Sequence, residues 1–260
     1  MSFSPFDLNG KVALITGGNG GIGLGMAEAL AQAGADVVIW GTNPDKLAAA
    51  RDKLAATGRR VRAEAVDTAD EAAIEAAMAV AIAEMGRLDF VSANAGRGKA
   101  APSFHAMDTE TWHHVMALNL DGVFWTLRAA CRHMVERAEA GDPGGSLLAI
   151  ASTSVIHGAP ANQAYAASKG ALLPMVKGLA VEYARYGIRA NSVLPGWTRS
   201  DMTAGLQQWD TFNRKAIGRV PMRRWGEPED FGGIAVYLAS DASRFHTGDA
   251  MVIDGGYTIY

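Results

Sequence analysis

The stretch VALITGGNGGIGLGMAEALAQA, residues 12–33, decides the fold. Its apolar run Val12 to Thr16 predicts a buried strand, and a helical pattern follows the glycine cluster Gly17 to Gly23. A strand, a glycine turn and a helix together are the context of a dinucleotide-binding fingerprint. The glycines let the backbone approach a pyrophosphate, and the helix N-terminus carries partial positive charge towards it. The alternative for the glycine cluster alone is a plain tight turn.

Apolar runs alternate with helical patterns along the rest of the chain. Further strands are predicted at residues 36–40, 61–66, 88–92, 146–151, 188–194 and 250–253, and helices at about 44–56, 70–85, 108–140, 165–186 and 228–239. Asn43 and Asp70 precede two of these helices as N-caps. The alternation indicates an α/β fold: a single doubly wound (Rossmann) domain over residues 1–260, with a parallel sheet of about seven strands and helices on both faces.

Composition excludes several classes of protein. The 260 residues are 49% hydrophobic with a net charge of −3 and no basic block, so nucleic acid is not expected as a partner. No apolar stretch is long enough to span a membrane, and the N-terminal residues MSFSPFDLNGK do not resemble a signal peptide. Cys131 is the only cysteine, which rules out an internal disulfide. We therefore expect a soluble, cytoplasmic protein.

The stretch STSVIHGAPANQAYAASK, residues 152–169, has the pattern of an acid–base site. Tyr165 and Lys169 are four residues apart and would share one helix face. A lysine ammonium one turn away would lower the pKa of the phenol, which is about 10 in water. Ser152 follows a predicted buried strand and could converge with Tyr165 on one substrate oxygen. Alternatively, Tyr165 is an ordinary helix aromatic and Lys169 its solvated neighbour.

Several candidate residues fall at the carboxyl ends of predicted strands, where ligands bind on such sheets. They are Gly17, Asp67, Asn94, Ser152 and Pro195. Asn119 lies in the middle of a predicted helix, where asparagine is mildly unfavourable, and its neighbours do not decide whether it is exposed.

In order and spacing these motifs resemble the short-chain dehydrogenase/reductase family. The resemblance rests on Thr16-Gly17-x-x-x-Gly21-x-Gly23, Asn94-Ala95-Gly96, Asn119, Ser152, Tyr165-x-x-x-Lys169 and Pro195-Gly196, and covers almost the whole chain. It implies an NAD(P)-dependent oxidoreductase that interconverts a secondary alcohol and a ketone by hydride transfer. Tyr165 would be the acid–base group, Ser152 would hold the reacting oxygen, Lys169 would bind the nicotinamide ribose, and Asn119 would hold a water in a proton relay.

The same resemblance predicts the cofactor contacts. These are Gly17, Asn19, Gly21, Ile22, Gly23, Thr42, Asn43, Asp67, Thr68, Asn94, Ala95, Gly96, Tyr165, Lys169, Pro195, Gly196 and Thr198. Asp67 would contact the adenine, Asn94 the adenosine side and Thr198 the carboxamide.

The end of the second strand bears on the choice between NAD and NADP. It reads Trp40-Gly41-Thr42-Asn43, without the carboxylate that usually selects NAD and without the arginine of many NADP-dependent relatives. We therefore expect a weak preference for NADP, with NAD still used.

Residues outside the family motifs suggest a substrate region. Ser154, His157 and Gln163 lie between Ser152 and Lys169, and Trp197 and Met202 follow the Pro-Gly turn. Residues 198–218 have weak periodicity and predict an apolar lid that excludes water during hydride transfer. The remaining histidines lack a metal-ligand pattern, so no metal is expected.

The substrate itself stays open among small-molecule alcohols and carbonyl compounds, including sugars, polyols and 3-oxoacyl compounds. Two alternatives to net oxidation or reduction are a non-catalytic nucleotide-binding sensor or scaffold, and an epimerase or dehydratase. The family resemblance implies a homotetramer. Apolar residues on more than one face of the helices near 122–134 and 164–183, together with the apolar tail 257–260, agree with association.

Overall fold

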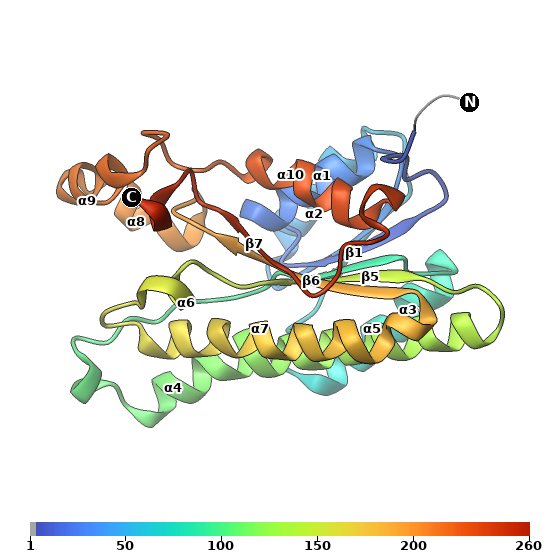
Figure 1. Ribbon diagram of the computed structural model, residues 1–260, viewed down its shortest axis with the longest axis horizontal. Coiled ribbons are helices and arrows are strands. Elements are labelled where there is room, and N and C mark those ends of the chain that lie inside the picture. The colour runs from blue at the N-terminus through green and yellow to red at the C-terminus, as the bar shows by residue number, and fades with distance from the viewer. Residues whose placement is uncertain (1–3) are drawn as a thin grey trace.

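Seven parallel strands form one continuous sheet in the computed structural model, which describes residues 4–260 (Figure 1). The strand order is β3-β2-β1-β4-β5-β6-β7. The bounds are β1 Val12–Thr16, β2 Asp36–Gly41, β3 Val61–Ala65, β4 Phe90–Ala93, β5 Gly145–Ile150, β6 Ile188–Pro195 and β7 Ala250–Ile253. The predicted doubly wound sheet is confirmed, with strand ends within about two residues of the predicted ones.

Helices cover both faces of the sheet (Figure 1). One layer contains α1 Gly21–Gln32, α2 Pro44–Ala55 and α10 Gly232–Ala239, and the other contains α3 Glu71–Met85, α5 Gly122–Glu139 and α7 Gln163–Tyr183. Strand side chains alternate between the layers: Leu14 and Val38 pack with the second, Ala13 and Val37 with the first. Burial on both faces explains why these strands are continuous apolar runs.

The topology creates a crevice between β1 and β4. From β1 the chain winds outward through β2 and β3, and then β4 pairs with the other edge of β1. At such a switch point the loops after the two strands diverge and leave room for a ligand at their carboxyl ends. The glycine loop after β1 and the Asn94-Ala95-Gly96 loop after β4 meet there.

Local capping fixes the start of two helices as predicted. The Asn43 Oδ1 accepts the Lys46 N–H at 3.0 Å at the start of α2, where Pro44 occupies the first helical position. The Asp70 carboxylate accepts the N–H groups of Ala72 and Ala73 at 2.9 and 3.3 Å at the start of α3.

The long helical region predicted for residues 108–140 is not one regular helix. It consists of α4 Thr109–Met116, a π turn over Ala117–Asp121, and α5. Asn119 sits in the π turn and is fully buried, so the possibility of a surface position is wrong. Its amide is hydrogen-bonded to loop backbone and to α7, which gives a physical reason for the irregular turn. Such π turns often occur at functional sites.

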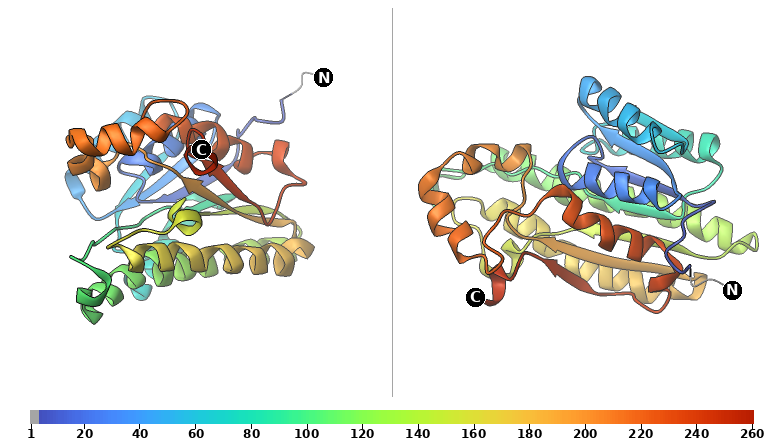
Figure 2. Two further views of the ribbon diagram at one scale, coloured as in Figure 1. Left: turned by 60° about the vertical axis from the view of Figure 1, so that its left-hand side comes forward. Right: turned by 90° about the horizontal axis from the view of Figure 1, so that it is seen from above.

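Residues 198–218 fold into short pieces without a long helix. They contain the 3₁₀ turn Asp201–Thr203, α8 Ala204–Gln207, α9 Asp210–Lys215 and the beginning of the 3₁₀ turn Ile217–Arg219. Aromatic side chains gather here: the ring centroids of Trp197 and Phe212 are 4.8 Å apart, and those of Phe212 and Trp225 are 5.8 Å apart. Figure 2 shows this segment standing to one side of the sheet, beside the C-terminus.

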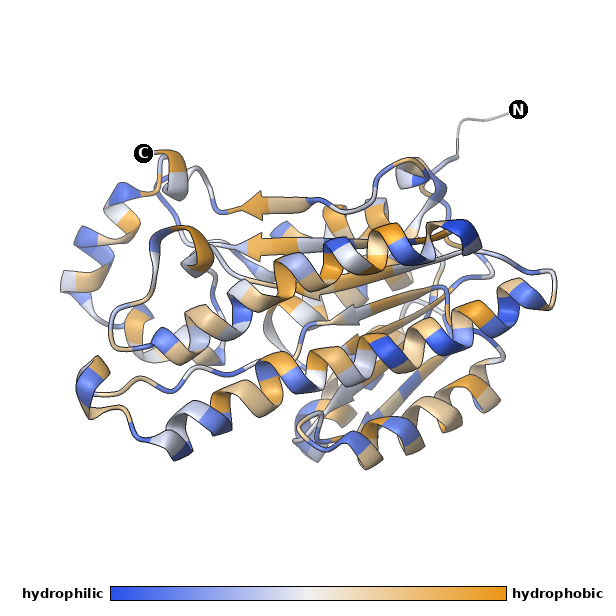
Figure 3. Cartoon of the chain, turned by 60° about the horizontal axis from the view of Figure 1, so that its bottom comes forward, coloured by the Kyte–Doolittle hydropathy of each residue, from blue (hydrophilic) through white to orange (hydrophobic). Residues whose placement is uncertain are grey.

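Other short elements complete the chain. These are α6 Ser154–His157 and 3₁₀ turns at Phe104–Ala106, Ala184–Tyr186, Pro228–Phe231, Asp241–Ser243 and Tyr257–Ile259. Among the described residues, no helix is both long and apolar enough to cross a bilayer. Figure 3 shows apolar residues at many positions along α5 and α7, interspersed with hydrophilic ones.

Candidate active site

The glycine loop is held by the neighbouring loop after β4. The Thr16 Oγ1 accepts the N–H groups of Asn94 and Ala95 at 3.0 and 2.9 Å. The Asn94 Nδ2 donates to the carbonyl oxygens of Thr16 and Gly17 at 2.8 and 3.3 Å. Asn94 therefore braces the glycine loop, a role that the sequence did not indicate.

Two positions in this loop can only be glycine. Gly17 has a φ of +63°, which disfavours any other residue. A Cβ on Gly23 would lie 2.3 Å from the Gly17 carbonyl oxygen and 2.5 Å from the Asn94 Nδ2. The close packing leaves backbone N–H groups at the start of α1 facing the crevice end of the sheet, which is an anion-binding arrangement. Gly21 and Ile22 form the first turn of this helix.

A cavity of about 520 Å³ opens between the ends of β1, β2 and β4. It is lined by Gly17, Asn19, Gly41, Thr42, Val66, Asp67, Thr68, Ala95, Gly96, Arg97 and Leu118. Seven of the predicted cofactor residues are among these, and the cavity has room for the adenosine half of a dinucleotide. Asp67 is exposed at its edge, and Thr68 is buried.

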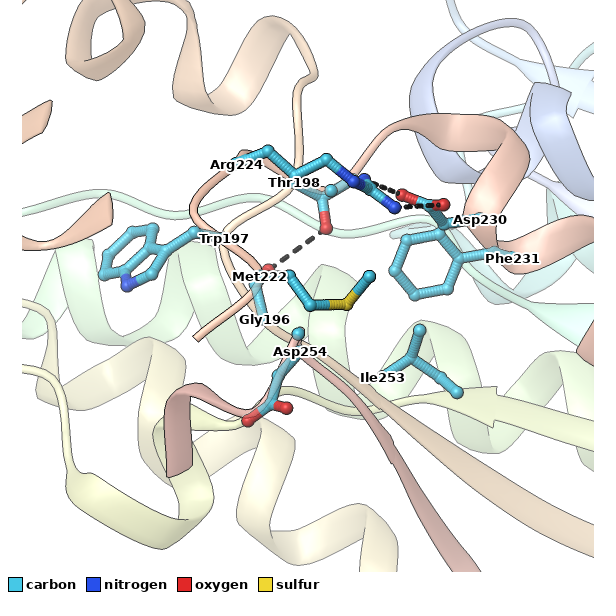
Figure 4. Close-up of a pocket in the computed structure, with 11 residues that line it drawn as sticks. Gly196, Trp197, Thr198, Met222, Arg224, Asp230, Phe231, Ile253 and Asp254 are labelled. Atoms are coloured by element: carbon cyan, nitrogen blue, oxygen red, sulfur yellow. Dashed lines mark hydrogen bonds and ion pairs between the residues drawn. The ribbon is translucent and has the colours of Figure 1, made fainter. Parts of the chain in front are cut away.

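The other predicted cofactor residues lie around this cavity or along the adjacent strand ends. Asn43 caps α2, Pro195 ends β6, and Gly196 and Thr198 line a smaller cavity of about 180 Å³ behind the Pro-Gly turn. Figure 4 shows Met222, Phe231 and Ile253 around this smaller cavity, with Arg224 paired to Asp230. None of Asn119, Ser152, Tyr165 and Lys169 lines it, so it is not the reaction centre.

The four predicted catalytic residues come together from three elements. Ser152 is buried just after β5, Tyr165 and Lys169 lie one turn apart on α7, and Asn119 is in the π turn. The Asn119 Nδ2 donates to the Arg97 carbonyl at 2.8 Å and to the Ser168 Oγ at 3.2 Å. A Cβ on Gly96 would be 3.2 Å from the Lys169 Nζ and 3.3 Å from the Asn119 Oδ1, so both groups border the same small space.

The alternative that Lys169 is a solvated neighbour of Tyr165 is wrong. Its side chain is buried, and its Nζ donates to the Ile150 carbonyl at 2.7 Å. Burial lowers the pKa of Lys169 to about 8. The protein thus holds an ammonium group with remaining donor capacity next to the reaction centre.

The pKa of Tyr165 differs from the expectation. Burial raises the pKa of the phenol, and the hydrogen bond with Ser152 opposes this rise without cancelling it. The expected lowering of this pKa by Lys169 is therefore not found, because desolvation of the phenolate is the larger effect. Tyr165 is accordingly a neutral phenol, ready to donate its proton, at neutral pH.

The predicted substrate residues separate into two groups. Ser154 is buried at the start of α6, its N–H donates to the Ser152 Oγ at 3.1 Å, and Gln163 begins α7. His157 and Met202 are exposed, and Trp197 belongs to the aromatic cluster with Phe212 and Trp225. The first group lies next to the candidate catalytic residues along the chain. In the second group, the rings of His157 and Trp197 both contact Tyr257, and Met202 lies within residues 198–218.

Asn162, near the start of α7, has an unpaired side-chain oxygen that the sequence did not reveal. It occupies the N-cap position of α7 without making a capping hydrogen bond, and its Oδ1 is buried without a partner. Ala161 before it has a φ of +62°, a strained conformation, and accepts a hydrogen bond from the Ala101 N–H at 2.8 Å. An asparagine that precedes a helix predicts an N-cap hydrogen bond. Only the structure shows that the Asn162 side chain does not make one.

These features define a doubly wound α/β fold that brings Ser152, Tyr165 and Lys169 together at the carboxyl ends of its strands. The family model described as enoyl-(acyl carrier protein) reductase matches residues 17–258. The chain belongs to the short-chain dehydrogenase/reductase family and is an NAD(P)-dependent alcohol dehydrogenase/ketoreductase.

Similar proteins include several that act on sugar acids by name. The chain is 34% identical to gluconate 5-dehydrogenase of Gluconobacter oxydans (strain 621H), over 98% of this chain and 97% of that protein. It is 35% identical to 2-dehydro-3-deoxy-D-gluconate 5-dehydrogenase of Dickeya dadantii (strain 3937), over 99% of each. A crystal structure of gluconate 5-dehydrogenase from Burkholderia cenocepacia J2315, in complex with NADP and tartrate, superposes with a TM-score of 0.92 at 36% identity, covering 99% of this chain and 98% of that one.

The comparisons favour catalysis over a sensor or scaffold role, since these relatives are named as dehydrogenases and the four acid–base residues are assembled here. Within residues 4–260 no three His, Cys, Asp or Glu side chains are grouped so that they could hold a metal ion.

Proposed function

We propose that the substrate is a polyhydroxylated carboxylic acid of the gluconate type, oxidised or reduced at a secondary carbon. The observation that carries this proposal is a set of buried oxygen atoms without partners beside the acid–base site: Ser154 Oγ, Asn162 Oδ1 and Gln163 Oε1. Unpaired buried acceptors are costly, and substrate hydroxyl groups could satisfy them. The names of the relatives point to the same chemical class.

The proposed reaction uses each residue according to its position. The cofactor, when bound, supplies or accepts the hydride. The neutral Tyr165 phenol donates its proton to the developing alkoxide in reduction, and the Tyr165 phenolate takes the alcohol proton in oxidation. The Ser152 hydroxyl holds the same oxygen, and Lys169 supplies a buried positive charge one turn away. The Asn119 side chain makes two hydrogen bonds of 2.8 Å with the Arg97 backbone, and these hold the π turn against the loop that contains Arg97.

The substrate proposal is tested with variants of the unpaired acceptors. A thermal-shift screen of sugar acids at saturating NADP identifies a ligand, and absorbance of the reduced nicotinamide then measures its turnover. We expect Gln163→Leu to raise the KM for this sugar acid at least tenfold, since a substrate hydroxyl loses its partner. The KM for a simple apolar ketone serves as the control and should stay within about twofold. Equal effects on both substrates would contradict a hydroxyl-binding role.

We also propose NADP as the preferred cofactor. A Cβ on Gly41 would lie 2.5 Å from the Asn19 side chain, so the position that often carries the NAD-selecting carboxylate has no room for one. Thr42 is exposed. The nearby Lys46 Nζ lies 2.5 Å from the Asp201 carboxylate, so this ammonium group forms an ion pair with a residue of the segment 198–218. The named complex with NADP in a similar structure supports the proposal.

The cofactor preference should be small and adjustable. We expect kcat/KM to favour NADP by less than about tenfold, because no arginine clamps a 2′-phosphate. Thr42→Arg should increase the preference for NADP, and Lys46→Met should reduce it. These ratios are measured with both cofactors and one working substrate. A preference for NAD above about tenfold, or ~1.4 kcal/mol, would show that another group reads the ribose.

The reaction should depend on pH differently in its two directions. Reduction needs the neutral phenol and the charged lysine, so its kcat/KM should be constant near neutrality and fall as pH rises through about 8, where Lys169 loses its proton. Oxidation needs the Tyr165 phenolate, which accepts the alcohol proton. Its kcat/KM should therefore rise with pH as the phenolate fraction grows, and the rise should extend to high pH because burial raises the pKa of Tyr165. An oxidation profile that is flat from about pH 6 to 10 would contradict this assignment.

We propose a homotetramer in the cytoplasm. Exposed apolar side chains on α5 and α7 support association: Val181 is 83% exposed and Phe124 is 44% exposed. Light scattering at micromolar concentration should give four times the chain mass, and Val181→Glu should lower it. Val80→Glu on α3 is the matched control. A monomer mass for the unaltered protein would refute the assembly.

The proposed cytoplasmic location is compatible with the free buried thiol of Cys131, since thiols stay reduced in that compartment.

Residues 198–218 are proposed as the substrate lid. Met202 and Trp209 on this segment are more than half exposed, although large apolar side chains are usually covered. Ser200 lies against the glycine loop, because a Cβ on Gly21 would be 3.2 Å from the Ser200 Cβ. The segment thus starts at the phosphate-binding loop and could cover the substrate side.

A further inference from the structure

The C-terminal turn packs on residues 219–222, which directly follow the lid residues 198–218 and are referred to as the end of the lid. The Asp254 carboxylate accepts the N–H groups of Gly256 and Thr258, each at 2.8 Å. Gly255 and Gly256 have φ values of +63° and +89°, and Cβ atoms there would lie 2.8 Å from Val220 and 2.9 Å from Pro221. This turn and residues 220–221 therefore pack so closely that only glycine fits between them.

Arg219 adds a second connection between the same two segments. Its guanidinium lies 5.2 Å from the centre of the Tyr257 ring, and its Nη2 donates to the Tyr260 carbonyl oxygen at 3.3 Å. In both views of Figure 2 the C-terminus lies beside the segment that carries α8 and α9. The C-terminal 3₁₀ turn, Tyr257–Ile259, is thus attached to the end of the lid.

Tyr257 extends from this unit to two residues of the proposed substrate side. Its ring centroid is 5.5 Å from that of His157, with an interplanar angle of 76°. It is 6.3 Å from that of Trp197, with an angle of 85°. Both are edge-to-face arrangements, which are favourable for aromatic pairs. Tyr257 therefore connects the loop after Ser152, the turn after β6 and the end of the lid.

We propose that Tyr257 is a substrate-positioning residue that couples the lid to the wall formed by His157 and Trp197. This inference rests on the proposed function, since it places the substrate beside His157 and under the lid. When the lid moves, Tyr257 moves with it, because Arg219 and the C-terminal turn connect the two. The rings of His157 and Trp197, which contact Tyr257, then move as well. A polyhydroxylated substrate would present its C–H face to these rings and its hydroxyls to Gln163 and Asn162.

The first test separates substrate binding from cofactor binding. Tyr257→Ala should raise the KM for the sugar acid about tenfold, as expected from two lost edge-to-face contacts, with kcat within about threefold. The NADP Kd from fluorescence titration should be unchanged. Tyr257→Phe keeps the ring and should behave like the unaltered enzyme. Ile259→Ala, in the same turn but 89% exposed, is the matched control. A KM change below about twofold, or a parallel loss of NADP affinity, would overturn the proposal.

The second test does not need the substrate. Hydrogen exchange of residues 198–218 with NADP bound should be faster in Tyr257→Ala than in Ile259→Ala, because the end of the lid loses the Tyr257 ring that connects it to His157, while the direct Phe212–Trp197 contact remains in both variants. Equal exchange in the two variants would refute the coupling. If exchange responds as expected and no sugar acid is turned over, the substrate class is wrong while the coupling through Tyr257 holds.

Discussion

Tyr165→Phe should bind NADP with near-normal affinity and lose about 10² to 10⁴ in turnover, the usual contribution of a positioned acid–base group. The phenylalanine ring keeps the packing of a half-buried side chain on α7 but cannot exchange a proton with the substrate oxygen. The hydrogen bond with Ser152 is lost as well. Steady-state rates with one working substrate measure this effect, and a fluorescence titration measures the cofactor affinity.

Tyr183→Phe is the matched control for this variant. Tyr183 lies on the same helix, at its far end, and contacts the apolar core rather than the acid–base residues. Removing its hydroxyl should leave turnover within about twofold of the unaltered enzyme. If Tyr165→Phe retained more than about a tenth of the normal rate, the acid–base role of Tyr165 would have to be abandoned.

Gly23→Ala should weaken NADP binding about 100-fold, or ~2.7 kcal/mol. The added Cβ would meet the Gly17 carbonyl oxygen at 2.3 Å and the Asn94 Nδ2 at 2.5 Å. Either the glycine loop or the Asn94 loop must shift, and both supply the rigid backbone around the phosphate site. Calorimetry gives the Kd, and circular dichroism checks that the sheet and helices are still formed.

Gly20→Ala tests whether the effect is specific to the crowded position. Gly20 is in the same loop with a φ of −179°, which any residue can adopt, and a Cβ there would meet nothing within 4 Å. Its NADP affinity should therefore stay within about threefold of normal. An affinity loss as large for Gly20→Ala as for Gly23→Ala would mean that any change in the loop is harmful, whatever its packing.

The strands, the helix caps and the family motifs could be predicted because their signals are local. A buried parallel strand is an apolar run such as Val12 to Thr16, and Asn43 caps a helix through the N–H three residues on. The strand ends then place Gly17, Asn94 and Ser152 at one edge of the sheet by topology alone. The spacing of Tyr165 and Lys169 likewise sets them on one helix face.

The details of the site could not be predicted, because they depend on contacts between distant segments. Asn119 makes a π turn within a stretch that reads as regular helix, since its amide bonds to Arg97 and Ser168 from other parts of the chain. The pKa of Tyr165 is raised because the side chain is buried, and the spacing of Tyr165 and Lys169 in the sequence gives no information about that burial. The unpaired side-chain oxygen of Asn162, at the N-cap position of α7, is likewise visible only in the structure.

The sequence by itself determined the class of fold, and it singled out a candidate cofactor site and candidate acid–base residues, because strand periodicity, glycine turns and helical spacing act within a few residues. Only the tertiary structure decided that Asn94 braces the glycine loop, that Lys169 is buried against the Ile150 carbonyl, and that Tyr257 meets His157. Such contacts join residues far apart in the chain. Their geometry follows from how the loops at the strand ends pack against one another, which no local pattern encodes.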